Sequence, residues 1–383
     1  MLLKINIIIF NILLTYNQTS ILKKFFVNPN IEEAETLPAV FYRSKSYFEE
    51  LKEKIFVKSW QFVGHHSILP ININTYPFEF IKNYIEEPLL LVKSEDEKII
   101  CLSNVCTHRA NIIINNKGNV RDLRCMYHGR KFNLDGKFKS MPEFSLAKEF
   151  PRNCDDLKEF PVSNLGPFIF VSLEPSFDFD TVCSKINQRI SFLPLSHIEY
   201  RSDLSKDYMV NSHWALYCDN YLEGFHIPFV HNDLNNVLDY EKYDTEIDEY
   251  FNLQIGYSKE GDDATFDFPK DHQDYKKNIS AYYYWIFPNT MINVYPWGIS
   301  INIIKPINMN KTKVSFLSYV YDESKLDQGA GSDLDKVERE DEFVVEGVNK
   351  GLKSRYYSTG RFSPSMEKGV HHFHRLISES LNR

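Results

Sequence analysis

The sequence predicts an α+β protein with a small all-β domain, at about residues 41–175, and a larger domain with an antiparallel sheet, at about 176–383. Between residues 62 and 173, short apolar runs alternate with Asn, Pro, Gly and Asp, which is typical of a small β domain. Longer strand-like runs between residues 281 and 321 precede an amphipathic helical pattern at 332–353. A chain of 383 residues has room for two or three domains, and its 43% hydrophobic content allows a large core.

The first forty residues (1–40) are expected to be an N-terminal extension, with the folded core beginning near Leu37. Residues 2–14 are mostly apolar, but this run is too short to span a bilayer. It has one early positive charge, Lys4, and no clear small-residue cleavage site. We therefore expect a cytoplasmic protein without a membrane partner. The net charge of −8 and the lack of a long basic run argue against nucleic acid as a partner.

Residues 41–60 are predicted to form a helix in front of the β domain, because four apolar side chains recur there at helical spacing: Phe48, Leu51, Ile55 and Phe56. Short apolar runs after this helix predict strands. An Asp-Gly turn at residues 135–136 separates two strand-like runs. These runs lie at residues 89–92, 99–102, 132–134 and 168–171.

The larger domain is predicted to begin with a helical segment around residues 214–230. Its predicted strands lie at residues 281–287, 290–295, 299–304 and 314–321. A turn at residues 308–311 separates the last two strands, which favours an antiparallel sheet.

Two short Cys/His patterns in the β domain predict a metal site. The sequence reads Cys106-x-His108 and, sixteen residues later, Cys125-x-x-His128. Two thiolates and two imidazoles can bind a structural zinc ion, or they can bind a Rieske [2Fe–2S] cluster with both Cys on one iron and both His on the other. Gly129 favours the cluster, because it leaves room for backbone N–H groups near sulfur. The other four cysteines are expected to be small buried hydrophobes.

A second metal site is predicted from Glu223-x-x-His226-x₄-His231. The spacing of the two His is a weak signal by itself, but Glu223 and His226 would share one face of a helix. Pro228 cannot continue a helix, so we expect a bend there that swings His231 towards His226. Two His and a carboxylate are the ligands of non-haem Fe(II) oxygenases.

The carboxylate is sought in the helix predicted at 332–353. Asp341 lies in the middle of an apolar stripe, where a carboxylate is costly unless it is paired or binds a metal. A buried, hydrogen-bonded Asp is the alternative. Glu340 lies off the stripe and is the weaker candidate. The stripe consists of Val337, Val344, Val345, Val348 and Leu352.

Together these patterns resemble the ring-hydroxylating, non-haem iron oxygenase α-subunits, from about residue 41 to the end of the chain. The resemblance implies a Rieske domain followed by a helix-grip catalytic domain. It implies cluster ligands Cys106, His108, Cys125 and His128, and iron ligands His226, His231 and Asp341. Rieske proteins of respiratory complexes have extra disulfide cysteines, where this chain has Asn111 and Tyr127. Many oxygenases have Trp after the His-Gly pair, where this chain has Arg130, which leaves the local packing open.

The resemblance also implies a homotrimer in which Glu223 connects the cluster of one subunit to an iron-binding His of the next. Glu at this position is typical of the branch that oxidises quaternary ammonium compounds such as choline, carnitine and betaine. Electrons would come from NAD(P)H through a separate reductase, because the sequence has no G-x-G-x-x-G unit. An aromatic ring-hydroxylating dioxygenase and a pure electron-transfer Rieske protein remain alternatives.

Two further clusters have open interpretations. The aromatic run from Tyr282 to Trp297 could form a cage for a trimethylammonium group, bind a flat aromatic ring, or be ordinary core. His371, His372 and His374 are expected to belong to a packed terminal helix rather than to a metal site.

Overall fold

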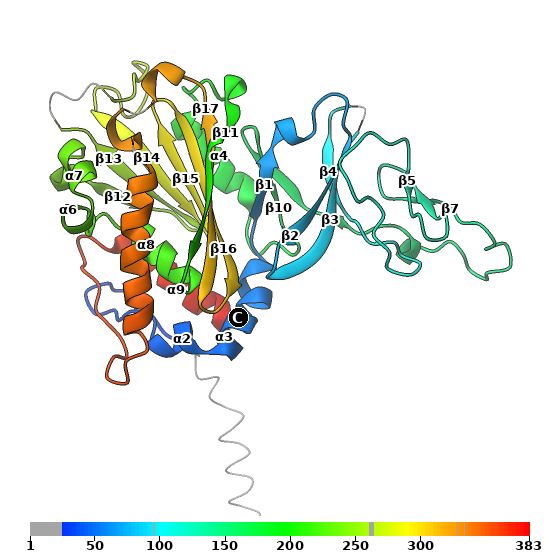
Figure 1. Ribbon diagram of the computed structural model, residues 1–383, viewed down its shortest axis with the longest axis horizontal. Helices are drawn as coiled ribbons and strands as arrows, with labels where there is room; N and C mark the ends of the chain where they lie inside the picture. Colours follow the sequence, from blue (N-terminus) through cyan, green and yellow to red (C-terminus); the bar gives the residue numbers. More distant parts are fainter. Residues whose placement is uncertain (1–24, 95, 260–263, 327, 333) are drawn as a thin grey trace, which may run out of the picture.

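The structure, a computed structural model, describes residues 25–383 apart from 95, 260–263, 327 and 333, so the apolar run at 2–14 lies outside the described residues. Within the described part, no helix is long and apolar enough to cross a membrane. The described residues form three small sheets at one end of the molecule and a seven-stranded antiparallel sheet at the other (Figure 1). The predicted α+β class is therefore confirmed.

The three small sheets have the strand orders β1-β10-β9, β2-β3-β4-β8 and β5-β6-β7. The strands predicted at 89–92, 99–102 and 168–171 are confirmed, whereas the run at 132–134 forms only the short strand β6. A separate apolar core, with Leu90, Leu102 and Phe132, lies under the Cys/His loops. The bounds are β1 Gln61–His65, β2 Thr75–Ile81, β3 Ile85–Lys93, β4 Ile99–Ser103, β5 Leu123–Arg124, β6 Lys131–Phe132, β7 Phe138–Ser140, β8 Glu159–Phe160, β9 Val162–Leu165 and β10 Phe168–Val171.

The large sheet has the order β11-β17-β16-β15-β14-β13-β12, with every neighbouring pair antiparallel. The four predicted strands are confirmed as its centre. Three more strands were not predicted: β11 is mostly exposed, β12 is short, and β13 is buried along nearly its whole length without alternation. The bounds are β11 Glu199–Val210, β12 Asp244–Ile247, β13 Phe251–Tyr257, β14 Ile279–Ile286, β15 Thr290–Tyr295, β16 Gly298–Asn308 and β17 Lys311–Val320.

Helices pack on the large sheet in a helix-grip arrangement. The long helix α8 (Leu334–Gly351) crosses in front of the sheet in Figure 1, and α5 (Trp214–Tyr221) contacts α8, the terminal helix α9 (Lys368–Asn382) and strand β16. The helix predicted at 332–353 is therefore confirmed. Helix α4 (Phe179–Ile190) was not predicted, and it packs beside β9.

The segment in front of the β domain is more ordered than expected. The predicted helix at 41–60 consists of α2 (Ala39–Arg43), α3 (Lys45–Leu51) and a π-helical turn at Lys52–Phe56, and all four predicted apolar side chains are buried. The expectation that the folded core begins near Leu37 was wrong. Phe25 and Val27 are buried in the main core, where the carbonyl of Phe25 accepts a hydrogen bond from Ser378 Oγ of α9 at 2.8 Å. The domain limits at 41–175 and 176–383 stay predictions.

Candidate active site

The two Cys/His loops have the same backbone geometry. In each loop the Cys carbonyl accepts a hydrogen bond from the N–H four residues later, from Ala110 at 2.9 Å and from Gly129 at 3.0 Å. Both of those residues have positive φ, at 54° and 73°. The N–H of Cys106 donates to Asn111 O, and the N–H of Cys125 donates to Arg130 O, at 2.9 and 2.8 Å. Two matching loops of this kind present one Cys and one His each to a shared centre.

The two types of candidate ligand differ in exposure. Cys106 and Cys125 are each 2% exposed, whereas His108 is half-buried and His128 is exposed. The two imidazole rings lie 4.8 Å apart. Asn111 Nδ2 donates a hydrogen bond to the sulfur of Cys125 at 3.6 Å. Such hydrogen bonds stabilise the sulfurs of an iron–sulfur cluster. These residues therefore fit a [2Fe–2S] group.

The role assigned to Gly129 needs correction. A Cβ at this position would meet Pro142 only at 3.6 Å, so space is not the reason for glycine. The left-handed backbone at φ 73° is the reason, because it closes the loop after His128.

Arg130, which follows Gly129, is packed as a buried cation. It is 2% exposed, and its Nη2 donates to Asp155 Oδ1 at 2.7 Å. Its guanidinium lies 5.0–5.6 Å from the ring centroids of three Phe side chains, so ring contacts replace the packing that a Trp would provide. The three rings belong to Phe132, Phe138 and Phe150.

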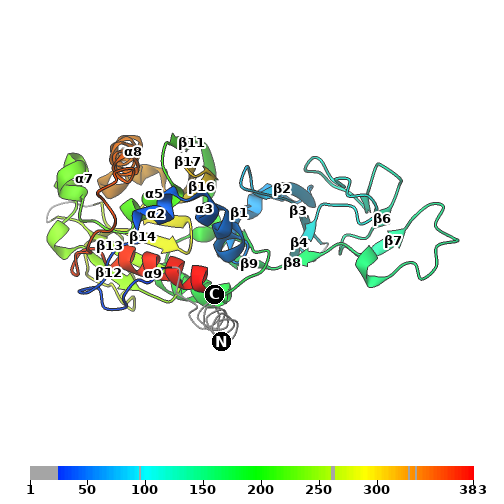
Figure 2. The same cartoon turned by 90° about the horizontal axis from the view of Figure 1, so that it is seen from below.

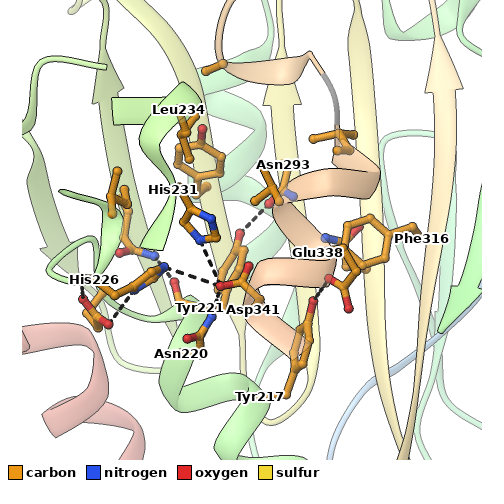
Figure 3. A pocket seen from close by; sticks show the side chains of 18 of the residues that line it. Tyr217, Asn220, Tyr221, His226, His231, Leu234, Asn293, Phe316, Glu338 and Asp341 are labelled. Carbon is orange, nitrogen blue, oxygen red and sulfur yellow. Dashed lines mark hydrogen bonds and ion pairs between the residues drawn. The ribbon is translucent and has the colours of Figure 1, made fainter. Parts of the chain in front are cut away.

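The residues predicted for the second site lie together. His226, His231 and Asp341 each offer a ligand atom, and these atoms lie within 4.8 Å of one another (Figure 3). Asp341 Oδ1 is 3.0 Å from His231 Nε2 and 3.6 Å from His226 Nε2. In the described part of the chain, no other group of three His, Cys, Asp or Glu side chains has this arrangement. Two imidazoles and one carboxylate around one point fit a single iron ion.

Both imidazoles are held by carboxylates on their outer nitrogen. His226 Nδ1 lies 2.7 Å from Glu223 Oε1, and His231 Nδ1 lies 2.7 Å from Glu340 Oε2. If each Nδ1 donates its proton, both Nε2 atoms are free to bind a metal. Burial disfavours protonation of His231, but the hydrogen bonds and charges of Asp341 and Glu340 outweigh burial and raise its pKa. Glu340 was judged the weaker ligand candidate, and its role as a hydrogen-bond partner of His231 was missed.

The chain around the two His is bent earlier than predicted. Helix α5 ends at Tyr221 and the next helix is α6 (Ile227–Val230), so Glu223 and His226 lie in the turn between two helices and not on one helix face. Pro228 lies in the first turn of α6, where it is tolerated because the first N–H groups of a helix have no partner within it. Gly224 permits this turn to approach Tyr243, whose ring lies 2.8 Å from where a Cβ would be.

The inner face of the helix that supplies Asp341 is wider than the predicted stripe, of which Val337 lines a cavity beside Asp341 and Leu352 is buried. Val345 is buried, but Val348 is 46% exposed, and Glu338 and Asn349 are buried in addition. Polar side chains therefore occupy part of the inner face of α8, which an apolar pattern could not reveal.

A cavity of about 100 Å³ opens beside the three candidate ligands. Of the aromatic run, Tyr283 and Tyr295 line this cavity, whereas Trp285 packs against Phe373 of α9 and Trp297 lines a neighbouring pocket. The aromatic residues around the cavity are Tyr217, Tyr221, Tyr243, Tyr283, Tyr295 and Phe316.

The remaining histidines and cysteines lie elsewhere. His371, His372 and His374 are buried in α9 and bond to three different partners, Asn28 O, Asn252 Oδ1 and Asp219 Oδ1. Because they do not converge, they form part of the packed helix, as expected. Three of the other cysteines are buried, but Cys154 is exposed, so the expectation was wrong for that residue.

Two family models match the chain. Residues 59–151 match the Rieske [2Fe-2S] domain, and residues 197–382 match the catalytic domain of the ring hydroxylating alpha subunit. The chain is 30% identical to choline monooxygenase of Beta vulgaris, over 91% of this chain and 78% of that protein. It is 27% identical to the carnitine monooxygenase oxygenase subunit of Escherichia coli K12, over 93% and 96%.

The chain has the same fold as the solved structure of a quaternary ammonium Rieske monooxygenase. That structure was reported in connection with carnitine oxidation and inter-subunit electron transfer. The TM-score is 0.72 at 23% identity, and the match covers 92% of this chain and 96% of that one. The protein is an oxidoreductase that belongs to the Rieske oxygenase α-subunits of the ring-hydroxylating family, terminal oxygenases that use a [2Fe–2S] cluster and a mononuclear iron and work with separate electron-transfer partners.

Proposed function

We propose that this protein hydroxylates a small quaternary ammonium compound. The observation that carries the proposal is the cavity beside His226, His231 and Asp341, which is lined by six aromatic rings and, among the described residues, by no Lys or Arg. Aromatic rings and carboxylates attract an organic cation, whereas an anionic substrate such as an aromatic acid would find no positive side chain. The similarity to choline and carnitine monooxygenases supports the same substrate class.

In this proposal the residues described above have distinct tasks. The two matching loops bind the cluster through Cys106, His108, Cys125 and His128. His226, His231 and Asp341 bind the single iron, and the outer carboxylates Glu223 and Glu340 orient the two imidazoles. When bound, these iron groups supply electron transfer and activation of O₂. One oxygen atom enters a C–H bond of the substrate and the other leaves as water, with the electron pair supplied from NAD(P)H through a separate reductase.

We further infer that the electrons pass between subunits of a homotrimer. In one chain, the loop next to β5 and the helices α6 and α8 lie at opposite ends of the molecule (Figure 1), and the view from below shows the same separation (Figure 2). Exposed apolar side chains flank both sites, Met126 and Tyr127 beside the cluster loops and Phe225 and Phe229 beside the iron site. Burial of such patches on one another would bring Glu223 between the cluster of one subunit and His226 of the next.

A single-turnover experiment tests the proposal without the reductase. Four samples of chemically reduced holoenzyme each receive one compound: choline, glycine betaine, carnitine or benzoate. Each sample is then mixed with ¹⁸O₂, and its products are analysed by mass spectrometry. We expect ¹⁸O in the product of at least one quaternary amine. Label only in hydroxylated benzoate would favour the aromatic alternative. Holoenzyme that holds a cluster but no mononuclear iron would favour a pure electron-transfer protein.

A further inference from the structure

Glu338 is a buried carboxylate at the edge of the cavity. It lies on α8 one turn before Asp341, is 1% exposed and lines the cavity together with Tyr217 and Phe316 (Figure 3). Its Oε2 accepts a short hydrogen bond from Tyr217 Oη, whereas its Oε1 is buried without any hydrogen-bond partner among the described residues. A buried carboxylate oxygen without a partner is costly and uncommon, so a missing partner is indicated.

The described part of the chain does not supply that partner. In the part of the chain that the structure describes, no Lys, Arg or His forms an ion pair with Glu338, and the nearby Arg339 points to Glu342 at 3.5 Å. Glu338 is also outside the group of candidate iron ligands. A bound iron would therefore neutralise the charge of Asp341 but not a charge on Glu338. Burial, together with the charges of Asp341 and Glu342, raises the pKa of Glu338 well above its ordinary value, so the empty cavity favours the protonated acid and a bound cation would favour the carboxylate.

We propose that Glu338 is the binding residue for the positive group of the substrate, and that the substrate is an organic cation without a carboxylate of its own. This inference rests on the proposed function, because it specifies which quaternary ammonium compounds enter the same cavity. The cation would lie near Oε1, with the ring of Phe316 beside it. A fully methylated nitrogen has no N–H, so the attraction is one of charge and not of hydrogen bonding.

The charge of the cavity also excludes one class of quaternary amine. Betaine and carnitine carry a carboxylate that would need a Lys or Arg, and the described cavity lining has neither. Near Glu338, such a carboxylate would be repelled without compensation. Choline has the same trimethylammonium group with a neutral hydroxyl in place of the carboxylate. The amide side chains that line the cavity are neutral and can bond to a hydroxyl; they are Asn220, Gln254, Asn293 and Asn302.

The experiment compares three ligands of similar size by calorimetry on the iron-loaded, oxygen-free holoenzyme. Choline is the cation, 3,3-dimethylbutan-1-ol is its uncharged isostere, and glycine betaine is the zwitterion. The variants are Glu338→Gln, which keeps the shape and the acceptor for Tyr217, and Glu338→Asp, which keeps the charge. Glu342→Gln is the control, because Glu342 lies on the same helix but does not line the cavity. Iron content and the visible spectrum of the cluster verify that each variant is loaded.

We expect the wild-type protein to bind choline about tenfold or more tightly than either of the other ligands. Glu338→Gln should lose about tenfold or more in choline affinity and leave the affinity for the isostere unchanged, while Glu338→Asp should recover part of the loss. Unchanged choline binding in Glu338→Gln, or an equal loss for the isostere, would overturn the inference. Tight binding of glycine betaine by the wild type would overturn the substrate class but leave the proposed function standing. Wild-type protein that binds and oxidises no quaternary amine would refute both.

Discussion

Replacement of Glu340 by Gln should weaken iron binding without affecting the cluster. Glu340 Oε2 lies 2.7 Å from His231 Nδ1, and the other nitrogen of the same ring faces Asp341 Oδ1 at 3.0 Å. The carboxylate therefore fixes the ring and makes Nε2 a stronger donor to a metal. Loss of such an outer partner typically lowers metal affinity by about 10–100-fold. Because the Glu340 side chain is 30% exposed, water will screen part of its charge, and we expect about tenfold, or about 1.4 kcal/mol.

The assay is an anaerobic titration of Fe(II) into protein whose mononuclear site has been emptied with a mild chelator. Glu342→Gln is the matched control. Glu342 lies two residues further along the same helix, and its carboxylate forms an ion pair with Arg339 at 3.5 Å. The visible absorption of the cluster should be the same in all three proteins. Unchanged iron affinity in Glu340→Gln, or an equal loss in Glu342→Gln, would refute the orienting role of Glu340.

Three further outcomes are expected. Glu223→Gln should retain both iron groups at saturating iron but abolish product formation, which single turnover with ¹⁸O₂ would detect; normal turnover would contradict a bridging role. Gly224→Ala should push Tyr243 into the cavity, because the new Cβ would lie 2.8 Å from its ring. This variant should have a higher KM and an unchanged iron content. The control Gly347→Ala should leave KM unchanged, because the new Cβ would have no atom within 4 Å. Burial lowers the pKa of His372 to about 4, so the unfolded chain binds more protons between pH 4 and 6.5. Stability should therefore be complete above pH 6.5 and fall by about 2 kcal/mol at pH 5 through this residue alone. Thermal unfolding at pH 7 and 5 would show a smaller difference in His372→Gln.

Local sequence patterns predicted the strands and helices in which apolar side chains are buried and polar side chains are exposed. The strands β14 to β17 carry apolar runs bounded by turns, and the sequence placed them correctly. Strand β11 is held only by its pairing with β17, and its mostly exposed side chains give no apolar alternation. Residues 25–36 join the core through α9, more than 300 residues away in the sequence, and no local signal reports such a contact.

The site residues also divide into those with a local sequence signal and those without one. The Cys and His residues of the first site were singled out because their spacing is rare, and Asp341 because a carboxylate interrupts an apolar stripe. The role of Glu340 beside His231 and the burial of Glu338 were not recognised, since both residues lie in a strongly acidic stretch of α8 where one carboxylate resembles the next. Only the folded chain shows that Glu340 contacts His231 and that Glu338 lines the cavity. The bend near residue 222 was misplaced at Pro228, because a proline inside a helical pattern marks a break and also suits a helix start.

Metal analysis tests the central claim most directly, that one chain holds a cluster and a separate iron at His226, His231 and Asp341. Fully loaded wild-type protein should contain about three irons and about two acid-labile sulfides per chain. Asp341→Ala should contain about two irons and about two sulfides, with the spectrum of the cluster unchanged. About two irons in the wild type, or about three in Asp341→Ala, would contradict the account.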